Sequence, residues 1–143
     1  MRVLPPIEEE FVSTGQVKVQ MRPIAILGEE SELAVQAAEC ANDQGQFWEF
    51  HDTLYANQVR EHNTGAFSRE NLKRFAEALE LDTVAFDSCL DSGKYASKVR
   101  DDTEAARRMG ITSTPTILVN GRQVSSSVDE LRAAIQEELG SGQ

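Results

Sequence analysis

A proline stands immediately before a short run of β-forming residues, and it restricts how that part of the chain can fold. Pro115 precedes the run Thr116–Val119, and Asn120-Gly121, the strongest two-residue hairpin signal, follows it. This order predicts a β-hairpin that returns from Arg122. Because proline has no N–H to donate to a ladder, Pro115 must lie at the strand entry. The peptide bond before it can be cis at a cost of only about 0.5–1 kcal/mol, and a trans proline at a strand start is the alternative.

The long stretch before the hairpin has helical periodicity throughout. Apolar residues recur at helical spacing over residues 31–109, and no part of this range reads as a strand. We expect Ser31, Ser68 and Asp82 to be helix N-caps, because each precedes an apolar stripe. Gly110 is expected to end the last of these helices. The range is therefore predicted to be an all-helical block.

The N-terminal residues predict a short helix and then a strand. Leu4, Ile7 and Phe11 are spaced as the apolar stripe of a helix, and the prolines between Leu4 and Ile7 fit only its first turn. Alternating apolar and polar residues follow, which predicts a strand over Val17–Leu27 with one buried face. Pro23 marks the end or the edge of that strand.

After the hairpin, the sequence predicts a closing helix. Ser127 and Glu130 have the spacing of a capping box, in which each side chain bonds to the backbone N–H of the other residue. The apolar stripe that follows consists of Leu131, Ala134, Ile135 and Leu139. We therefore expect an amphipathic helix that begins after Ser127.

The charge of the chain argues against two classes of partner. Its net charge is −10, from 24 acidic and 14 basic residues. Nucleic acid and anionic membrane surfaces both need a positive protein face, so we expect neither as a partner. No apolar stretch approaches the roughly 20 residues that span a bilayer. The N-terminus shows no apolar signal core, so we expect no export signal and leave the compartment open.

The two cysteines lie far apart and belong to no reactive motif. Cys40 and Cys89 are 49 positions apart, and neither is part of a Cys-x-x-Cys. With His51 and His62 as the only histidines, metal-ligand spacing is absent, and no metal site is expected. Each cysteine falls in an apolar helical pattern, so we expect both to be buried and inert, whether paired or free.

One aromatic segment is expected to lie in the core. Phe47, Trp48 and Phe50 are close together in the helical block. His51 shares a helical face with Phe47 and Leu54, which favours a core or boundary histidine over a catalytic one.

Three segments together resemble the DsbA-like thiol–disulfide oxidoreductases of the thioredoxin fold. Gly110–Arg122 (GITSTPTILVNGR) is similar to the cis-proline loop of that fold. Ala37–Asp52 and Phe86–Tyr95 are similar to the first and the later helices of the family's helical insert. The resemblance extends from about Leu4 to Leu139. Ser113, where the family commonly has glycine, is a minor departure.

The resemblance implies a fold, a domain organisation, an activity and a cellular compartment. The fold is α/β and thioredoxin-like, with an all-helical insert, and residues 1–143 form a single domain. Residues 1–30 supply a helix and a strand, 31–109 the insert, and 110–143 the cis-proline loop, the hairpin and the last helix. The family's activity is protein disulfide exchange, mostly outside the cytoplasm, and no cofactor is implied.

The resemblance also assigns roles to four residues. Thr114 and Pro115 are expected to bind substrate, because the residue before the family's cis-proline offers its backbone groups to a bound peptide. The expected partner is a peptide or a thiol protein. The resemblance also implies that Cys40 and Cys89 form a structural disulfide, because some family members have a similar arrangement. The apolar faces of the two helices that carry these cysteines must pack together. Two buried free thiols are the alternative.

The departure from the family concerns its chemistry. Members carry Cys-x-x-Cys at the start of their first helix, whose N-terminus lowers the pKa of the first thiol. This chain is expected to begin inside that helix, at Leu4–Phe11, so we predict that it is inactive as an oxidoreductase. A redox-inactive module that binds through the cis-proline groove is the alternative. A kappa-class glutathione transferase or isomerase, with serine or cysteine at the same helix start, is a more distant one.

The expected sheet has a gap. The family's first strand lies between the predicted strand Val17–Leu27 and the run Thr116–Val119, and it is absent here. Unpaired strand edges are templates for another chain. We therefore expect self-association, in the simplest case as a homodimer through the sheet.

Overall fold

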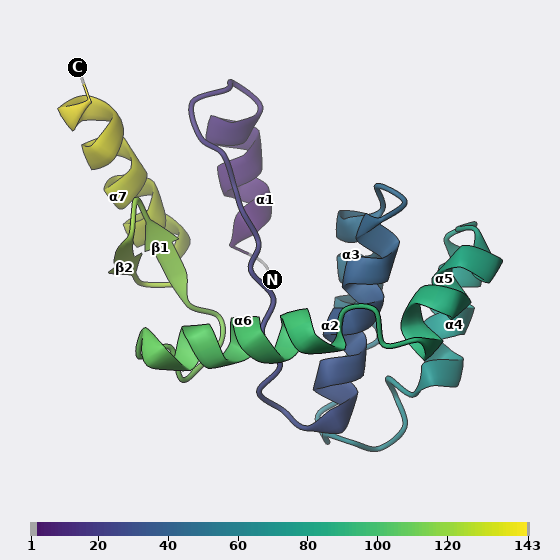
Figure 1. Ribbon diagram of the computed structural model, residues 1–143. Coiled ribbons are helices and arrows are strands. Elements are labelled where there is room, and N and C mark those ends of the chain that lie inside the picture. The colour runs from purple at the N-terminus through teal and green to yellow at the C-terminus, as the bar shows by residue number, and fades with distance from the viewer. Residues whose placement is uncertain (1–2, 143) are drawn as a thin grey trace. The chain divides into compact units, whose positions relative to one another are not determined.

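The computed structural model describes residues 3–142 and divides into two compact units (Figure 1). The hairpin unit comprises Met1–Met21 and Ile111–Gln143, and the helical unit comprises Arg22–Gly110. Within residues 3–142, no helix is both long enough and apolar enough to cross a membrane.

The helical unit is built from the five helices that the periodicity predicts as a block. They are α2 (Glu29–Asn42), α3 (Phe47–Ala56), α4 (Arg69–Ala78), α5 (Thr83–Asp91) and α6 (Ala96–Arg108). Their apolar stripes meet in one core, at whose centre the rings of Phe50 and Phe86 lie 5.5 Å apart. Both side chains are fully buried. The small residues Ala37 and Ala41 let α2 approach its neighbours closely, which places this helix against α3, α5 and α6.

Two of the three predicted N-caps are confirmed. The Ser68 side chain accepts a hydrogen bond from the backbone N–H of Asn71, and Asp82 accepts one from the N–H of Ala85. Each cap satisfies a backbone donor that the first helical turn leaves without an intrahelical partner. α4 and α5 therefore begin where their local sequence indicates.

The third predicted N-cap, Ser31, is wrong. α2 begins two residues earlier at Glu29, after Gly28, whose φ is +99°. Asn63, from the loop between α3 and α4, provides the cap: its Oδ1 accepts from the N–H of Glu30 at 3.1 Å, and its Nδ2 donates to the Leu27 carbonyl at 3.3 Å. A Cβ on Gly28 would lie only 2.4 Å from the Asn63 amide, so this position requires glycine.

The hairpin unit contains the predicted N-terminal helix, the hairpin and the closing helix. α1 (Leu4–Ile7) has prolines in its first turn and continues into the wider π-helical turn η1 (Glu8–Val12). α7 (Val128–Ser141) packs on α1 and on the hairpin. Their apolar cluster is closed at the surface by an ion pair, in which Arg132 Nε lies 2.7 Å from Glu10 Oε2. The buried members of the cluster are Ile7, Phe11, Leu131 and Ile135.

The predicted hairpin is confirmed in position and register. β1 (Ile117–Val119) and β2 (Arg122–Val124) pair antiparallel, with Val119 opposite Arg122 across the two-residue turn Asn120-Gly121. Both turn residues have positive φ, at +47° and +83°. A tight hairpin of this kind needs such angles at both positions, and asparagine and glycine tolerate them.

The predicted strand over Val17–Leu27 is wrong. Within residues 3–142 the only sheet pairs β1 with β2, and residues 17–26 form no ladder. Alternation of apolar residues predicts a buried face, whereas a strand also needs a partner backbone for its N–H and C=O groups. The N–H of Ala25 instead donates to the side-chain oxygen of Thr103 on α6, at 3.0 Å. The homodimer expected from a gap in this sheet stays a prediction.

The predicted start of α7 after Ser127 is confirmed, but the predicted capping box is not formed. Ser127 is the N-cap residue, but its side chain makes no capping hydrogen bond. The N–H of Ser127 donates to the side-chain oxygen of Ser125 at 3.3 Å, so it is not free for Glu130, and the reciprocal bond of a capping box is lost.

Candidate functional site

The loop before β1 is exposed and carries unused backbone groups. The Thr114–Pro115 peptide bond is cis, and Ser113, Thr114 and Pro115 are all exposed. Among the described residues, neither the N–H nor the C=O of Thr114 has a hydrogen-bond partner. A free donor and acceptor on an exposed loop can pair with a strand of another chain.

One side-chain hydrogen bond holds the shape of this loop. The hydroxyl of Thr116 donates to the carbonyl of Ser113 at 2.7 Å, and so closes a short turn around Thr114 and Pro115. The turn leads directly into β1 at Ile117, whose backbone is held by β2. The loop is therefore anchored at its C-terminal side by the hairpin that the sequence predicts.

The two cysteines form a disulfide between α2 and α5. Cys40 and Cys89 have an S–S distance of 2.10 Å and Cα atoms 5.9 Å apart, which is the pairing that the family resemblance implies. Because the chain contains only these two cysteines, it holds no free thiol. The bond lies in the helical unit, whereas Thr114 and Pro115 lie in the hairpin unit.

The two sulfur atoms have different surroundings. Cys40 is 1% exposed within the core of the helical unit, as predicted. Cys89 is only partly buried, so the expectation that both are buried is wrong for this residue. Cys89 lies beside a surface cluster of Asp43, Lys94 and Tyr95, which the sequence analysis did not single out.

These neighbours form a hydrogen-bonded cluster around one carboxylate. Lys94 Nζ lies 2.7 Å from Asp43 Oδ2, and the Tyr95 hydroxyl donates to Asp43 Oδ1. The Lys94 bond, with help from Tyr95, holds the pKa of the Asp43 carboxyl below its ordinary value of 3.8. The same carboxylate raises the pKa of Lys94 and of Tyr95 above their ordinary values.

The lowered pKa of Asp43 leads to a testable pH dependence. We expect Asp43→Asn to lower the free energy of unfolding at pH 7 by up to about 1 kcal/mol, the range for partly exposed ion pairs. A lowered pKa in the folded state means that the stabilisation is present above the carboxyl's unfolded pKa and is lost as the pH falls through the folded value. Urea denaturation from pH 7 to pH 2 should show the difference shrinking, and a difference that grows toward acid would contradict it.

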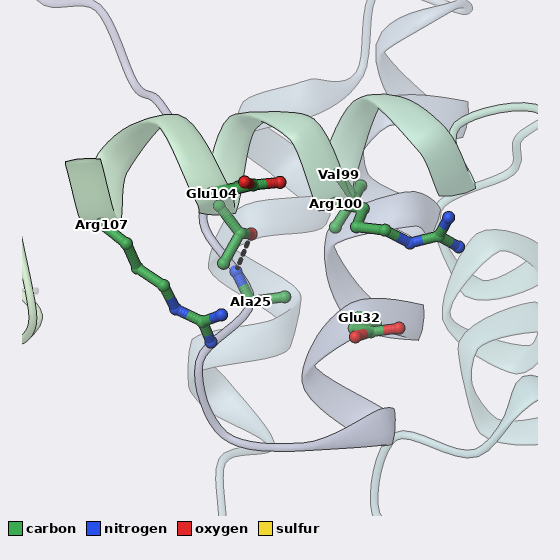
Figure 2. A pocket seen from close by; sticks show the side chains of 7 residues that line it. Ala25, Glu32, Val99, Arg100, Glu104 and Arg107 are labelled. Carbon is green, nitrogen blue, oxygen red and sulfur yellow. Dashed lines mark hydrogen bonds between the residues drawn. The ribbon is translucent and has the colours of Figure 1, made fainter. Parts of the chain in front are cut away.

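A small hollow in the helical unit has a mixed charged lining. Its volume is about 140 Å³, and Figure 2 shows Arg100 and Arg107 reaching from α6 and Glu32 from α2. The dashed line in the figure is the bond from Ala25 to Thr103 that holds the preceding segment against α6. No cysteine or histidine lines this hollow, so its lining offers no group for thiol chemistry.

His51 is confirmed as a core residue. It is 8% exposed, its Nδ1 lies 3.0 Å from Asp52 Oδ1, and the Tyr55 ring covers it with centroids 4.6 Å apart. Its Nε2 is buried and has no partner among the described residues. A nitrogen enclosed in this way cannot reach a substrate.

The prediction of an aromatic core around α3 is confirmed for Phe50 and wrong for Trp48. Phe50 is fully buried, whereas Trp48 is 36% exposed. Two residues along a helix correspond to about 200° of rotation, so the two side chains leave α3 on opposite sides. Phe47 shares the Phe50 stripe and is partly buried.

Comparison with known proteins identifies relatives over nearly the whole chain. A family model described as Thioredoxin matches residues 1–137. The probable disulfide bond formation protein D of Bacillus anthracis is 30% identical over 140 residues, which cover 96% of this chain. The chain spans 64% of that relative's length.

Two further comparisons extend this result. The crystal structure of oxidised BdbD from Bacillus subtilis superposes with a TM-score of 0.86 at 28% identity, over 96% of this chain and 77% of that one. The Na(+)/H(+) antiporter NhaA 3 of Salinispora tropica is 32% identical over 141 residues, which form only 21% of that protein.

Proposed function

Because the chain belongs to the DsbA-like proteins of the thioredoxin fold, we propose that it binds extended, thiol-bearing peptide segments at its cis-proline loop and does not itself exchange their disulfides. The match to the thioredoxin family model and the likeness to BdbD confirm the predicted family and the predicted thioredoxin-like fold. The binding role of Thr114 and Pro115 and the lack of catalysis are our own proposals.

The observation that carries the proposal is the pair of unused backbone groups on Thr114. Thr114 is an exposed residue whose N–H and C=O have no hydrogen-bond partner among the described residues, and two such groups can form the hydrogen bonds by which a strand adds a partner. Such bonds recognise the backbone of a peptide and leave its side chains free. A binding site of this kind accepts many sequences, which suits a protein that handles diverse thiol substrates.

The cysteine inventory supports the second half of the proposal. Thiol–disulfide exchange needs a thiolate to attack, and the most reactive ones lie at helix N-termini or beside cations. Both cysteines of this chain are joined in one disulfide within the helical unit, away in sequence from the loop at Thr114. The chain therefore has no free thiol that could attack a disulfide in a peptide bound at the loop.

Peptide binding tests the first half. We expect Thr116→Val to weaken binding of a fluorescent, cysteine-containing peptide by about 2- to 10-fold, because it removes the hydroxyl that holds the loop to Ser113, a bond of about 0.5–1.5 kcal/mol. Fluorescence anisotropy measures the change, and Thr116→Ser, which keeps the hydroxyl, should bind like the parent chain. Equal binding by the valine variant, or none by the parent, would contradict the proposal.

An activity assay tests the second half. We expect the purified chain to leave the rate of insulin reduction by dithiothreitol at its uncatalysed value, because no free thiol lies at the loop. Turbidity of the insulin B chain follows the reaction. The matched control is Cys40→Ala with Cys89→Ala: acceleration by the parent that this variant lacks would place the chemistry on the helical unit and sink the proposal.

A module that binds one particular peptide sequence, with or without cysteine, is the second candidate, and one observation favours it. The relative from Salinispora tropica shows that a segment of this type also forms a fifth of an antiporter. Peptide selectivity separates the two functions: a module of this kind would bind one peptide sequence whether or not it contains cysteine. A thiol-substrate site would bind many sequences.

A further inference from the structure

The two cysteines of the disulfide in the helical unit differ in exposure. Cys40 Sγ belongs to a residue that is 1% exposed and packed against Ala37 and Ala41, whereas Cys89 is partly exposed. A hollow of about 310 Å³ opens over the bond, with Ser88 and Ser92 of the α5 end on its wall. This volume falls at the lower end of sites for small molecules.

We propose that this hollow is a thiol-exchange site for small thiols, which attack Cys89 while Cys40 is the leaving sulfur. In the first step a thiolate forms a bond to Cys89 Sγ, the Cys40–Cys89 bond breaks, and Cys40 leaves with the electron pair and takes a proton from solvent. A second thiolate then attacks the mixed disulfide, which releases the thiol's own disulfide and a reduced Cys89. Two thiols are oxidised and one protein disulfide is reduced.

The geometry selects the sulfur that is attacked. Exchange requires the nucleophile to approach one sulfur along the S–S axis, from the side opposite the other sulfur. Cys40 also lines the hollow, but it is only 1% exposed and its core neighbours are apolar. Cys89 is the partly exposed cysteine of the pair, so we expect a small thiol in the hollow to attack its sulfur and to form the mixed disulfide there.

The charges at the hollow set the rate for thiols of different charge. Asp43 Oδ2 lies 3.8 Å from Cys89 Sγ, and this carboxylate repels an approaching thiolate. Lys94, whose side chain is 54% exposed and whose Nζ lies 2.7 Å from the same oxygen, offsets that repulsion. The charges of these two residues therefore make the reaction rate at Cys89 depend on the charge of the incoming thiol. This effect is independent of the cis-proline loop.

The first experiment identifies the reacting sulfur. The oxidised chain is treated briefly with 2-mercaptoethanol, quenched with N-ethylmaleimide, and digested for mass spectrometry. We expect the mercaptoethanol adduct on Cys89 and maleimide on Cys40, with at least 10-fold selectivity, and loss of that selectivity in 6 M guanidinium. An adduct mainly on Cys40, or equal adducts in the native protein, would overturn the proposal.

The second experiment separates charge from loosening of the fold. We compare Asp43→Asn and Lys94→Gln in reactions with anionic 2-mercaptoethanesulfonate and cationic cysteamine. Asp43→Asn should speed the anionic thiol by about 3- to 10-fold more than the cationic one, and Lys94→Gln should do the reverse. Equal acceleration of both thiols by Asp43→Asn would mean that the helices have merely loosened, and would refute the assignment.

A matched ion pair elsewhere in the helical unit supplies the control. Lys73 Nζ lies 2.6 Å from Asp91 Oδ2, both side chains are partly exposed, and neither residue lines the hollow. Lys73→Gln should leave the ratio of the two rates unchanged. A change as large as that of Lys94→Gln would contradict a local role for Lys94.

Discussion

Replacing both Cys40 and Cys89 by alanine is expected to lower the free energy of unfolding by about 4 kcal/mol. The disulfide closes a loop with a sequence separation of 49, and in the chain-entropy model a loop of this length restricts the unfolded state by about that amount. The loss is large against the about 5–15 kcal/mol by which ordinary domains are stable. Alanine suits the site because Cys40 is buried among alanines, where a serine hydroxyl would lack a partner.

Urea denaturation of the oxidised, reduced and double-alanine proteins measures this effect. Reduction of the parent chain should reproduce most of the loss, and the dependence on urea should steepen because the unlinked unfolded chain exposes more surface. The Cys89→Ala variant alone is the control for the bond itself, since it removes the link and leaves Cys40 in place. A loss below about 1 kcal/mol would show that the unfolded chain is already restricted by other contacts.

Truncating Phe50 to alanine should cost about 3–5 kcal/mol, the range for large-to-small changes of buried aromatic residues. Phe50 is fully buried and its ring lies 5.5 Å from that of Phe86. Removing the ring takes apolar surface out of the core and leaves a cavity. The surrounding helices cannot easily collapse into this cavity, because the disulfide also holds them in place. Thermal or urea denaturation gives the value.

Val84→Ala is the matched control for Phe50→Ala. Val84 is 80% exposed on α5, so its truncation should change the stability by less than about 0.5 kcal/mol. A loss below about 1 kcal/mol for Phe50→Ala would mean that the core repacks. Because Phe50 and Cys40 belong to one buried cluster, we do not expect the two substitutions to add independently.

Together these results would separate stability from binding. Both substitutions act on the helical unit, whereas the proposed peptide contacts at Thr114 belong to the hairpin unit. Thr116→Val, by contrast, should weaken peptide binding while lowering the free energy of unfolding by no more than the about 0.5–1.5 kcal/mol of that one hydrogen bond. Each variant therefore reports on one of the two units.

Local sequence was enough to predict the elements whose signals involve neighbouring residues. The caps Ser68 and Asp82 bond to backbone groups three residues away, and the turn Asn120-Gly121 depends only on the backbone angles that these two residues tolerate. The helical block follows from the periodic spacing of apolar residues. For the same reason, the family could be identified from three ordered segments of the chain.

Features that depend on distant residues were decided by the tertiary structure. Asn63, 33 positions from Glu30, caps α2 in place of Ser31, and Thr103 on α6 takes the N–H of Ala25 where the alternation predicts a strand. The partial exposure of Cys89 could not be predicted from the sequence either. An apolar stripe shows which residues of a helix face inward, but it does not show where the neighbouring helix stops covering them. Sequence by itself thus determined the helices, the hairpin and the family. The long-range contacts decided which backbone groups are paired and which cysteine is partly exposed, because hydrogen bonds and burial depend on residues that meet only after folding.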